Sequence, residues 1–151
     1  MGLEKSLSAK IIDCIKGGGK IFMCGNGGSA SMSQHFAGEL VGKFREERVA
    51  LPAIALTSDI ATITAVANDY GYEYVFERQL QALAKPDDVL IILSTSGKSA
   101  NCLKAAEWGK KTHMVVIDWP RLGTSVSSKQ EYQLRLIHKT CELVERAFLW
   151  K

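Results

Sequence analysis

This sequence of 151 residues lacks several features that define membrane, secreted or nucleic-acid-binding proteins. It contains no apolar stretch that approaches the length of a membrane span, and its N-terminus lacks the apolar core of a signal peptide. The net charge is +3 and there is no long basic run, so the charge pattern gives no reason to expect nucleic acid as a partner. We therefore expect no membrane partner and no nucleic-acid partner.

The cysteines are scattered, and the motif Cys-x-x-Cys is absent. The four cysteines each lie in or beside an apolar segment; they are Cys14, Cys24, Cys102 and Cys141. This placement is typical of small buried residues rather than of a disulfide framework or a cysteine metal site. We therefore expect free thiols in a reducing compartment, the cytoplasm.

What is present is the ordinary composition of a globular protein, with 46% hydrophobic and 23% charged residues, which predicts a single domain over residues 1–151.

The expected secondary structure alternates between strands and helices. The continuous aliphatic run Val89–Leu93 is typical of a strand that is buried on both faces of a parallel sheet. Further strands are expected at 20–24, 53–56 and 114–117. Helical patterns are expected before Gly17, after Gly28, from Ser58-Asp59 through Val66, from Tyr72 to Ala84, from Ala100 to about Lys110, and around Leu134 to Phe148. A turn is expected at 68–71. Strands that alternate with helices predict an α/β fold, a parallel sheet flanked by helices on both faces.

A glycine-rich turn follows the first expected strand, within the stretch 24–43. Gly25, Gly27 and Gly28 allow a sharp bend and a close approach of the backbone to a ligand, and Ser29 is the expected N-cap of the next helix. Free amides and the helix dipole at such a position favour an anion. Gly25-x-Gly27-x-x-Ala30 also fits a loose dinucleotide-binding pattern, but no well-placed acidic residue follows the next strand.

A second polar turn, Ser94-Thr95-Ser96-Gly97-Lys98-Ser99, follows the strongest strand. Its hydroxyls, together with amides at the start of the next helix, predict a phosphate-binding loop. The alternative is a serine-capped turn, which accounts for only one or two of the hydroxyls. A Walker A loop is excluded, because its leading glycine would fall at Ile92. Both turns should lie at the carboxyl edge of the sheet, where ligands bind in such folds.

Four polar residues form a candidate metal site. His35 and Glu39 are four residues apart and share one helix face. Gln130 and His138 are eight apart on the last helix, which also lets both face one site. Imidazole and carboxylate ligands suit zinc, whereas a glutamine ligand is unusual. His35 and Glu39 could instead form an ordinary solvated contact, and Gln130 and His138 could be surface or satisfied core residues. His113 is interpreted as structural.

The motifs in combination resemble the bacterial phosphoheptose isomerases of the SIS (sugar isomerase) family. The resemblance runs from about Lys20 to Glu145, with the motifs in the family's order. It is carried by Cys24-Gly25-Asn26-Gly27-Gly28-Ser29, His35-Phe36-Ala37-x-Glu39-Leu40, Asn68-Asp69, Ser94-Thr95-Ser96-Gly97-x-Ser99, Gln130-Glu131 and His138.

The resemblance implies a SIS-type three-layer fold and the conversion of sedoheptulose 7-phosphate to D-glycero-D-manno-heptose 7-phosphate, for lipopolysaccharide or capsule synthesis in bacteria. It implies that Glu39 and His138 are the catalytic acid/base pair. It implies a zinc site made of His35, Glu39, Gln130 and His138. The implied substrate-binding residues are Asn26, Gly27, Gly28, Ser29, Glu39, Asn68, Asp69, Ser94, Thr95, Ser96, Ser99 and Gln130. It also implies a homotetramer with sites shared between subunits.

The sequence departs from the family pattern in some places. Relative to that pattern, most of a long N-terminal helix is missing before the first strand, and the segment between Ile117 and Gln130 is shorter by roughly a helix and a strand. Each difference is either a part of a longer protein that this sequence omits or a genuine deletion. Lys43 replaces a usual arginine, and Lys98 a common asparagine. A non-catalytic relative, which binds a replication-initiator partner or senses a sugar phosphate, is the alternative. The partner-binding relatives lack the histidine that this chain keeps as His138.

Overall fold

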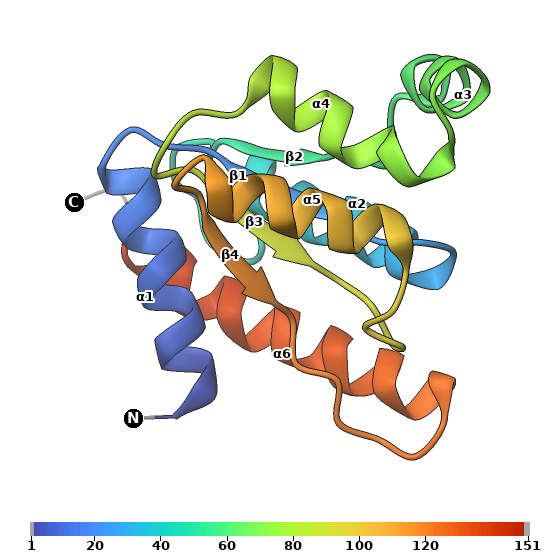
Figure 1. Ribbon diagram of the computed structural model, residues 1–151. Coiled ribbons are helices and arrows are strands. Elements are labelled where there is room, and N and C mark those ends of the chain that lie inside the picture. The colour runs from blue at the N-terminus through green and yellow to red at the C-terminus, as the bar shows by residue number, and fades with distance from the viewer. Residues whose placement is uncertain (1, 150–151) are drawn as a thin grey trace.

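A computed structural model describes residues 2–149 of the chain, in which helices and strands alternate (Figure 1). The elements are α1 (Leu3–Lys16), β1 (Ile21–Cys24), α2 (Gly28–Val41), β2 (Ala53–Ala55), α3 (Ile60–Asp69), the 3-10 helix η1 (Tyr72–Tyr74), α4 (Val75–Leu83), β3 (Val89–Ile92), α5 (Ala100–Lys111), β4 (Val115–Asp118) and α6 (Val126–Arg146).

The sheet is parallel throughout, with the strand order β2-β1-β3-β4. The central strands are β1 and β3, and every residue of both is buried, as the aliphatic composition predicts. Their ends are in register, since Cys24 pairs with Ile92. The turns that follow these two strands therefore leave the same edge of the sheet side by side.

Alternate residues of each central strand enter two separate cores. Ile21 and Met23 of β1 pack with residues of α1, α2 and α6 on one face of the sheet. Phe22 and Cys24 pack with residues of α3, α4 and α5 on the other face. In Figure 1, α3 and α4 lie above the sheet and α6 lies below it. The expected three-layer α/β fold is confirmed.

The strand order places the two glycine- and serine-rich turns at a topological switch point. The chain leaves β1 into α2, which covers one face, and leaves β3 into α5, which covers the other. The crevice between two such diverging connections is where open α/β sheets bind ligands. The fold therefore brings together two turns that are about 70 residues apart in the sequence.

Three local expectations are wrong. The N-cap of α2 is Gly27, with φ of 56°, and not Ser29, which lies in the first turn. The expected turn at 68–71 begins later, because α3, which Asp59 caps at its start, continues through Asn68 and Asp69. The expected helix from Tyr72 to Ala84 divides into η1 and α4.

The four cysteines lie buried as free thiols, on both sides of the sheet. In residues 2–149, no helix combines the length and the apolar character needed to cross a membrane.

Candidate active site

The turn after β1 approaches the turn after β3 closely enough to exclude side chains. A Cβ at Gly25 would lie 2.6 Å from the carbonyl oxygen of Leu93, so only glycine fits there. A polar contact joins the two turns further on, where Asn26 and Asn101 exchange side-chain hydrogen bonds of 2.9 and 2.8 Å. The Tyr72 hydroxyl also donates to the Asn26 oxygen, at 2.9 Å. These contacts fix the two turns as one unit.

The Ser94–Ser99 loop is shaped by its own hydroxyls. The amide of Gly97 donates to Ser94 Oγ at 2.9 Å, and the amide of Lys98 donates to Ser96 Oγ at 3.1 Å. Both hydroxyls act as acceptors in these bonds and keep a hydrogen to donate. Ser99 is the N-cap of the 12-residue helix α5, and its side chain makes no capping bond. Three serine hydroxyls thus lie in the loop that leads into the N-terminus of α5, and the predicted binding of a phosphate there stays a prediction.

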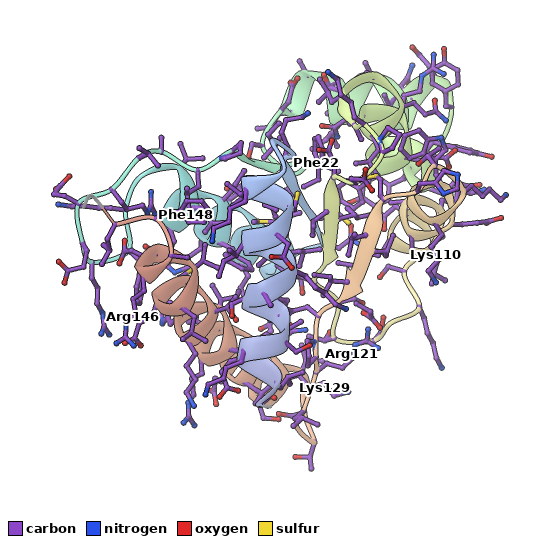
Figure 2. All side chains as sticks on the ribbon, turned by 90° about the vertical axis from the view of Figure 1, so that its left-hand side faces the viewer. Phe22, Lys110, Arg121, Lys129, Arg146 and Phe148 are labelled. Carbon is purple, nitrogen blue, oxygen red and sulfur yellow. The ribbon has the colours of Figure 1, made fainter. Side chains whose placement is uncertain are left out.

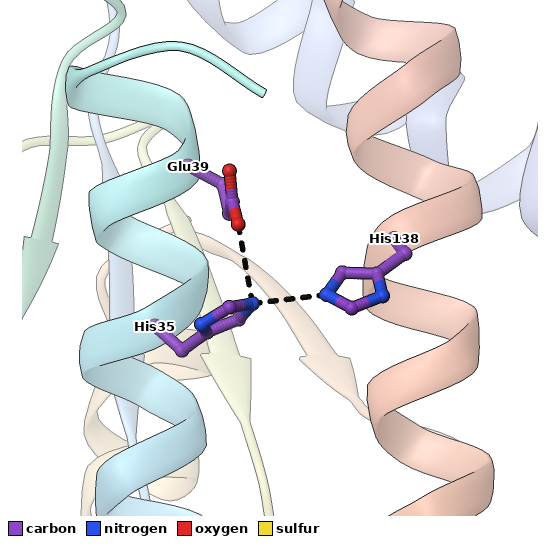
Figure 3. Close-up of side chains that lie close together, drawn as sticks. All are labelled: His35, Glu39 and His138. Atoms are coloured by element: carbon purple, nitrogen blue, oxygen red, sulfur yellow. Dashed lines mark hydrogen bonds and ion pairs between the residues drawn. The ribbon is translucent and has the colours of Figure 1, made fainter. Parts of the chain in front are cut away.

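The second part of the site is a group of three side chains on two adjacent helices. His35 and Glu39 of α2 face His138 of α6 (Figure 3). The Nε2 atom of His35 lies 3.0 Å from Nε2 of His138 and 3.2 Å from Oε1 of Glu39. One ligand atom from each residue lies within 4.8 Å of the others. Three of the four predicted metal ligands, His35, Glu39 and His138, therefore lie together as a possible metal-binding group.

The surroundings of this cluster hold it while leaving it open to a ligand. The Phe44 ring packs against His138 with 5.6 Å between ring centroids. Arg48, which is buried, donates to the backbone carbonyl of Glu39 at 2.6 Å. The side chain of His35 is 43% exposed and that of Glu39 is 20% exposed, so a small molecule can reach both.

The helices α2 and α6 run alongside each other in the same direction. The side chain of Gln130 lies over Gly28 at the start of α2, and His138 lies against His35 two turns further on. Gln130 is thus placed beside the glycine-rich turn, between the two parts of the site. Its predicted role as a metal ligand and substrate contact stays a prediction.

Asn68 and Asp69 lie at the C-terminal end of α3, exposed, and hydrogen-bond to each other at 2.9 Å. Within residues 2–149, their side chains make no hydrogen bond to another predicted site residue. Their role in substrate binding also stays a prediction. Three residues that sequence reasoning did not single out support the site: Arg48, Tyr72 and Asn101.

Comparison with known proteins agrees with this geometry. The family described as the SIS domain matches residues 4–118. The chain is 42% identical to a phosphoheptose isomerase of Campylobacter jejuni, over 91% of this chain and 83% of the relative. It is also 42% identical to one of Helicobacter pylori, over 99% of this chain and 88% of the relative. The chain belongs to the phosphoheptose isomerases of the SIS family. The family and the enzyme class expected from the motifs are confirmed.

Solved structures give the same result. A phosphoheptose isomerase from Francisella tularensis superposes with a TM-score of 0.90 at 34% identity, over 95% of this chain and 85% of that one. One from Neisseria gonorrhoeae gives a TM-score of 0.84 at 33% identity, with the same coverage. The Helicobacter pylori alignment spans 176 residues, against 151 in this chain, so the relative has residues with no counterpart here.

Proposed function

We propose that this phosphoheptose isomerase converts sedoheptulose 7-phosphate to D-glycero-D-manno-heptose 7-phosphate through an enediol. The observation that carries the proposal is the convergence of His35, Glu39 and His138 beside two turns that are suited to a phosphate. A ketose–aldose isomerisation moves one proton between C1 and C2 and others between the two oxygens. It therefore needs a base for the carbon-bound proton and a group that shuttles protons on oxygen.

Glu39 is the proposed base, and His138 is the proposed acid and base for the oxygens. A carboxylate is ionised at neutral pH and can accept a proton from carbon. An imidazole can both donate and accept near neutral pH, as the transfer between O1 and O2 requires. His35 lies between the two, within 3.2 Å of both, and orients them.

The three side chains also fit a zinc ion. Two imidazole nitrogens and a carboxylate oxygen are common zinc ligands, and three protein ligands leave a position for substrate. The side chain of Gln130, two turns before His138 on α6, is the proposed fourth ligand. When bound, the metal supplies polarisation of the carbonyl and stabilisation of the enediolate charge.

The distance between the two parts of the site suits a seven-carbon substrate. His35 is seven residues after Gly28 on α2, a rise of roughly 10 Å. An extended heptose with a terminal phosphate is of similar length. Phosphate held by Ser94, Thr95, Ser96 and Ser99 thus places C1 and C2 near Glu39. The binding energy of the phosphate group, which is remote from the reaction, is thus used to orient the reacting carbons.

The remaining parts of the proposal concern assembly and biological setting. We propose a homotetramer, in which exposed Asn68 and Asp69 contribute to a site shared between subunits. The product then enters heptose synthesis for lipopolysaccharide or capsule in the bacterial cytoplasm. Light scattering that gives four chains per particle supports this assembly, whereas a monomer at working concentration excludes a shared site.

The direct test is to incubate the purified protein with sedoheptulose 7-phosphate and to follow the anomeric proton of the aldose by NMR. Product formation that depends on Glu39 supports the proposal. Tight binding of the sugar phosphate without turnover, in the presence of zinc, would instead indicate a sensor. The cluster that includes His138 argues against that alternative, since a sensor has no use for an acid/base pair.

A further inference from the structure

Two basic side chains hold the Ser94–Ser99 loop by its backbone. Nε of Arg121, in the connection between β4 and α6, donates to the carbonyl of Ser94 at 2.8 Å. Nζ of Lys129, in the first turn of α6, donates to the carbonyl of Thr95 at 3.3 Å. Figure 2 shows both residues at the end of the molecule where α6 begins. Two consecutive carbonyls are thus directed toward α6 and the connection before it.

The orientation of a backbone carbonyl also fixes the orientation of the N–H group in the same peptide unit. In a trans peptide the C=O and the following N–H point in opposite directions, and residues 2–149 contain no cis peptide bond. The N–H groups of Thr95 and Ser96 therefore point away from Arg121 and Lys129. In the described part of the chain, neither amide donates a hydrogen bond to another protein group. These are the donors that an anion in the loop requires.

The guanidinium of Arg121 is itself fixed. It forms an ion pair with Asp118 at the end of β4, and its side chain is only 27% exposed. It also lies against Gly97, where φ is +69° and a Cβ would overlap the guanidinium. A planar group with several donors can hold the Ser94 carbonyl and the Asp118 carboxylate together, which a lysine ammonium does less well.

We infer that Arg121 is a positioning residue, which orients the Thr95 and Ser96 amides of the loop toward the phosphate of the substrate. This inference rests on the proposed binding of phosphate by the loop. Arg121 contacts backbone and Asp118 and does not act on the reacting carbons. Its loss should therefore weaken phosphate binding while proton transfer at Glu39 continues.

The test compares Arg121→Met with Arg146→Met, which removes an exposed arginine that also pairs with an acid, Glu142, one turn away. Isothermal titration with inorganic phosphate gives Kd, and isomerisation of sedoheptulose 7-phosphate gives KM and kcat. For Arg121→Met we expect Kd and KM to rise about tenfold, with kcat within about threefold, since well-oriented hydrogen bonds to a charged group are lost. For Arg146→Met all three values should match the parent.

Arg121→Lys separates position from charge. If the guanidinium fork is needed for orientation, the Kd of Arg121→Lys for inorganic phosphate stays above that of the parent by about fivefold or more. Full recovery with lysine would assign the effect to charge alone and overturn the inference. Lys129→Met, which releases the Thr95 carbonyl, should raise Kd in the same direction and serves as a second variant if Arg121→Met does not fold.

Failure of the inference and failure of the proposed function give different results. If the parent isomerises the sugar and Arg121→Met keeps parental Kd and KM, the function stands and the inference is overturned. If the parent binds phosphate in an Arg121-dependent way but forms no aldose, the inference stands and the proposed reaction fails. A parent that binds no phosphate overturns the inference.

Discussion

The Nε2 atoms of His35 and His138 lie 3.0 Å apart, although 103 positions separate the two residues in the sequence. One ligand atom from each histidine and one oxygen of the Glu39 carboxylate all lie within 4.8 Å of one another. A shared proton can hold two imidazoles in this arrangement, and a metal ion can replace that proton. The metal prediction follows from this geometry.

We predict that a chelator removes isomerase activity and that zinc restores it. His35→Ala should bind zinc at least tenfold more weakly, because one of three clustered ligands is lost. The measurement is zinc content after dialysis against a competing chelator, together with activity. His113→Asn is the matched control, since His113 lies in a turn with φ of 62°, which asparagine tolerates. Equal zinc content in parent and His35→Ala would exclude this site.

We predict that Ser96→Ala weakens substrate binding without disturbing the fold. The Ser96 hydroxyl accepts from the Lys98 amide and has a hydrogen left for an anion. Removal of one such hydrogen bond to a charged ligand should raise KM about tenfold. Ser6→Ala on α1 is the control. Unchanged affinity for sedoheptulose 7-phosphate in Ser96→Ala would show that the phosphate binds elsewhere.

A buried ion pair should be the main electrostatic determinant of stability near the site. Arg48 Nε lies 3.6 Å from Oε1 of Glu145, with side chains 1% and 4% exposed. Glu145 also accepts from the backbone amides of Phe44 and Arg45, which anchors the segment after α2. Arg48→Met leaves a buried carboxylate without its partner and should lower the free energy of unfolding by about 3 kcal/mol.

Urea unfolding measures this loss. Lys111→Met is the control, because its pair with Glu107 is exposed and such pairs contribute about 0–1 kcal/mol. Arg48→Met should also reduce activity, since Arg48 donates to the Glu39 carbonyl. If Arg48→Met unfolds at the same urea concentration as Lys111→Met, the buried pair is not stabilising.

Alkaline pH should destabilise the protein through a buried thiol. Burial raises the pKa of Cys141 far above its ordinary value of 9.0. Above about pH 9 the unfolded chain loses this proton while the folded protein keeps it, so the unfolding free energy falls as pH rises. The fall attributable to one thiol approaches about 1.4 kcal/mol per pH unit. Cys141→Ala should show a shallower fall between pH 8 and about pH 10 in urea titrations. An identical slope in parent and variant would contradict this.

The elements that the sequence predicted best are those whose pattern allows one solution. Val89–Leu93 is aliphatic without interruption and lies between Pro86-Asp87-Asp88 and the Ser94–Ser99 turn, so its shortness and its flanks favour a doubly buried strand over a helix. His35 and Glu39 had to share a face once α2 was helical. The end of α3 was less well predicted, because Asn68 and Asp69 favour turns locally but Asp59 caps a helix that continues through them.

The contacts that stabilise the site could not be predicted from the pattern of residues in the sequence. Arg48 and Arg121 lie in connections without periodicity, and their partners are mainly backbone carbonyls, which have the same chemistry in every residue. A charged residue in a connection is usually solvated, so its identity gives no signal that it is buried or fixed. The role of Tyr72 could not be predicted for a related reason. Its hydroxyl contacts Asn26 only because of the path that the chain takes through η1.

The final prediction concerns the division of labour between Glu39 and His138. Glu39→Gln keeps the size of the side chain and removes the base. It should abolish both isomerisation and the exchange of the substrate's C1 or C2 proton with solvent deuterium, a loss of at least 100-fold. Binding of the sugar phosphate should persist, because the serine loop is intact. The measurement is deuterium incorporation by NMR alongside product formation.

His138→Gln should behave differently, since proton abstraction by Glu39 survives it. We expect slow turnover with measurable exchange, as transfer between the oxygens becomes limiting. Glu142→Gln, at a partly exposed position one turn further along α6, is the control for loss of a carboxylate. Exchange at near-parental rate in Glu39→Gln would show that Glu39 is not the base. His138, which is the next group capable of accepting a carbon-bound proton at this position, would then take that role.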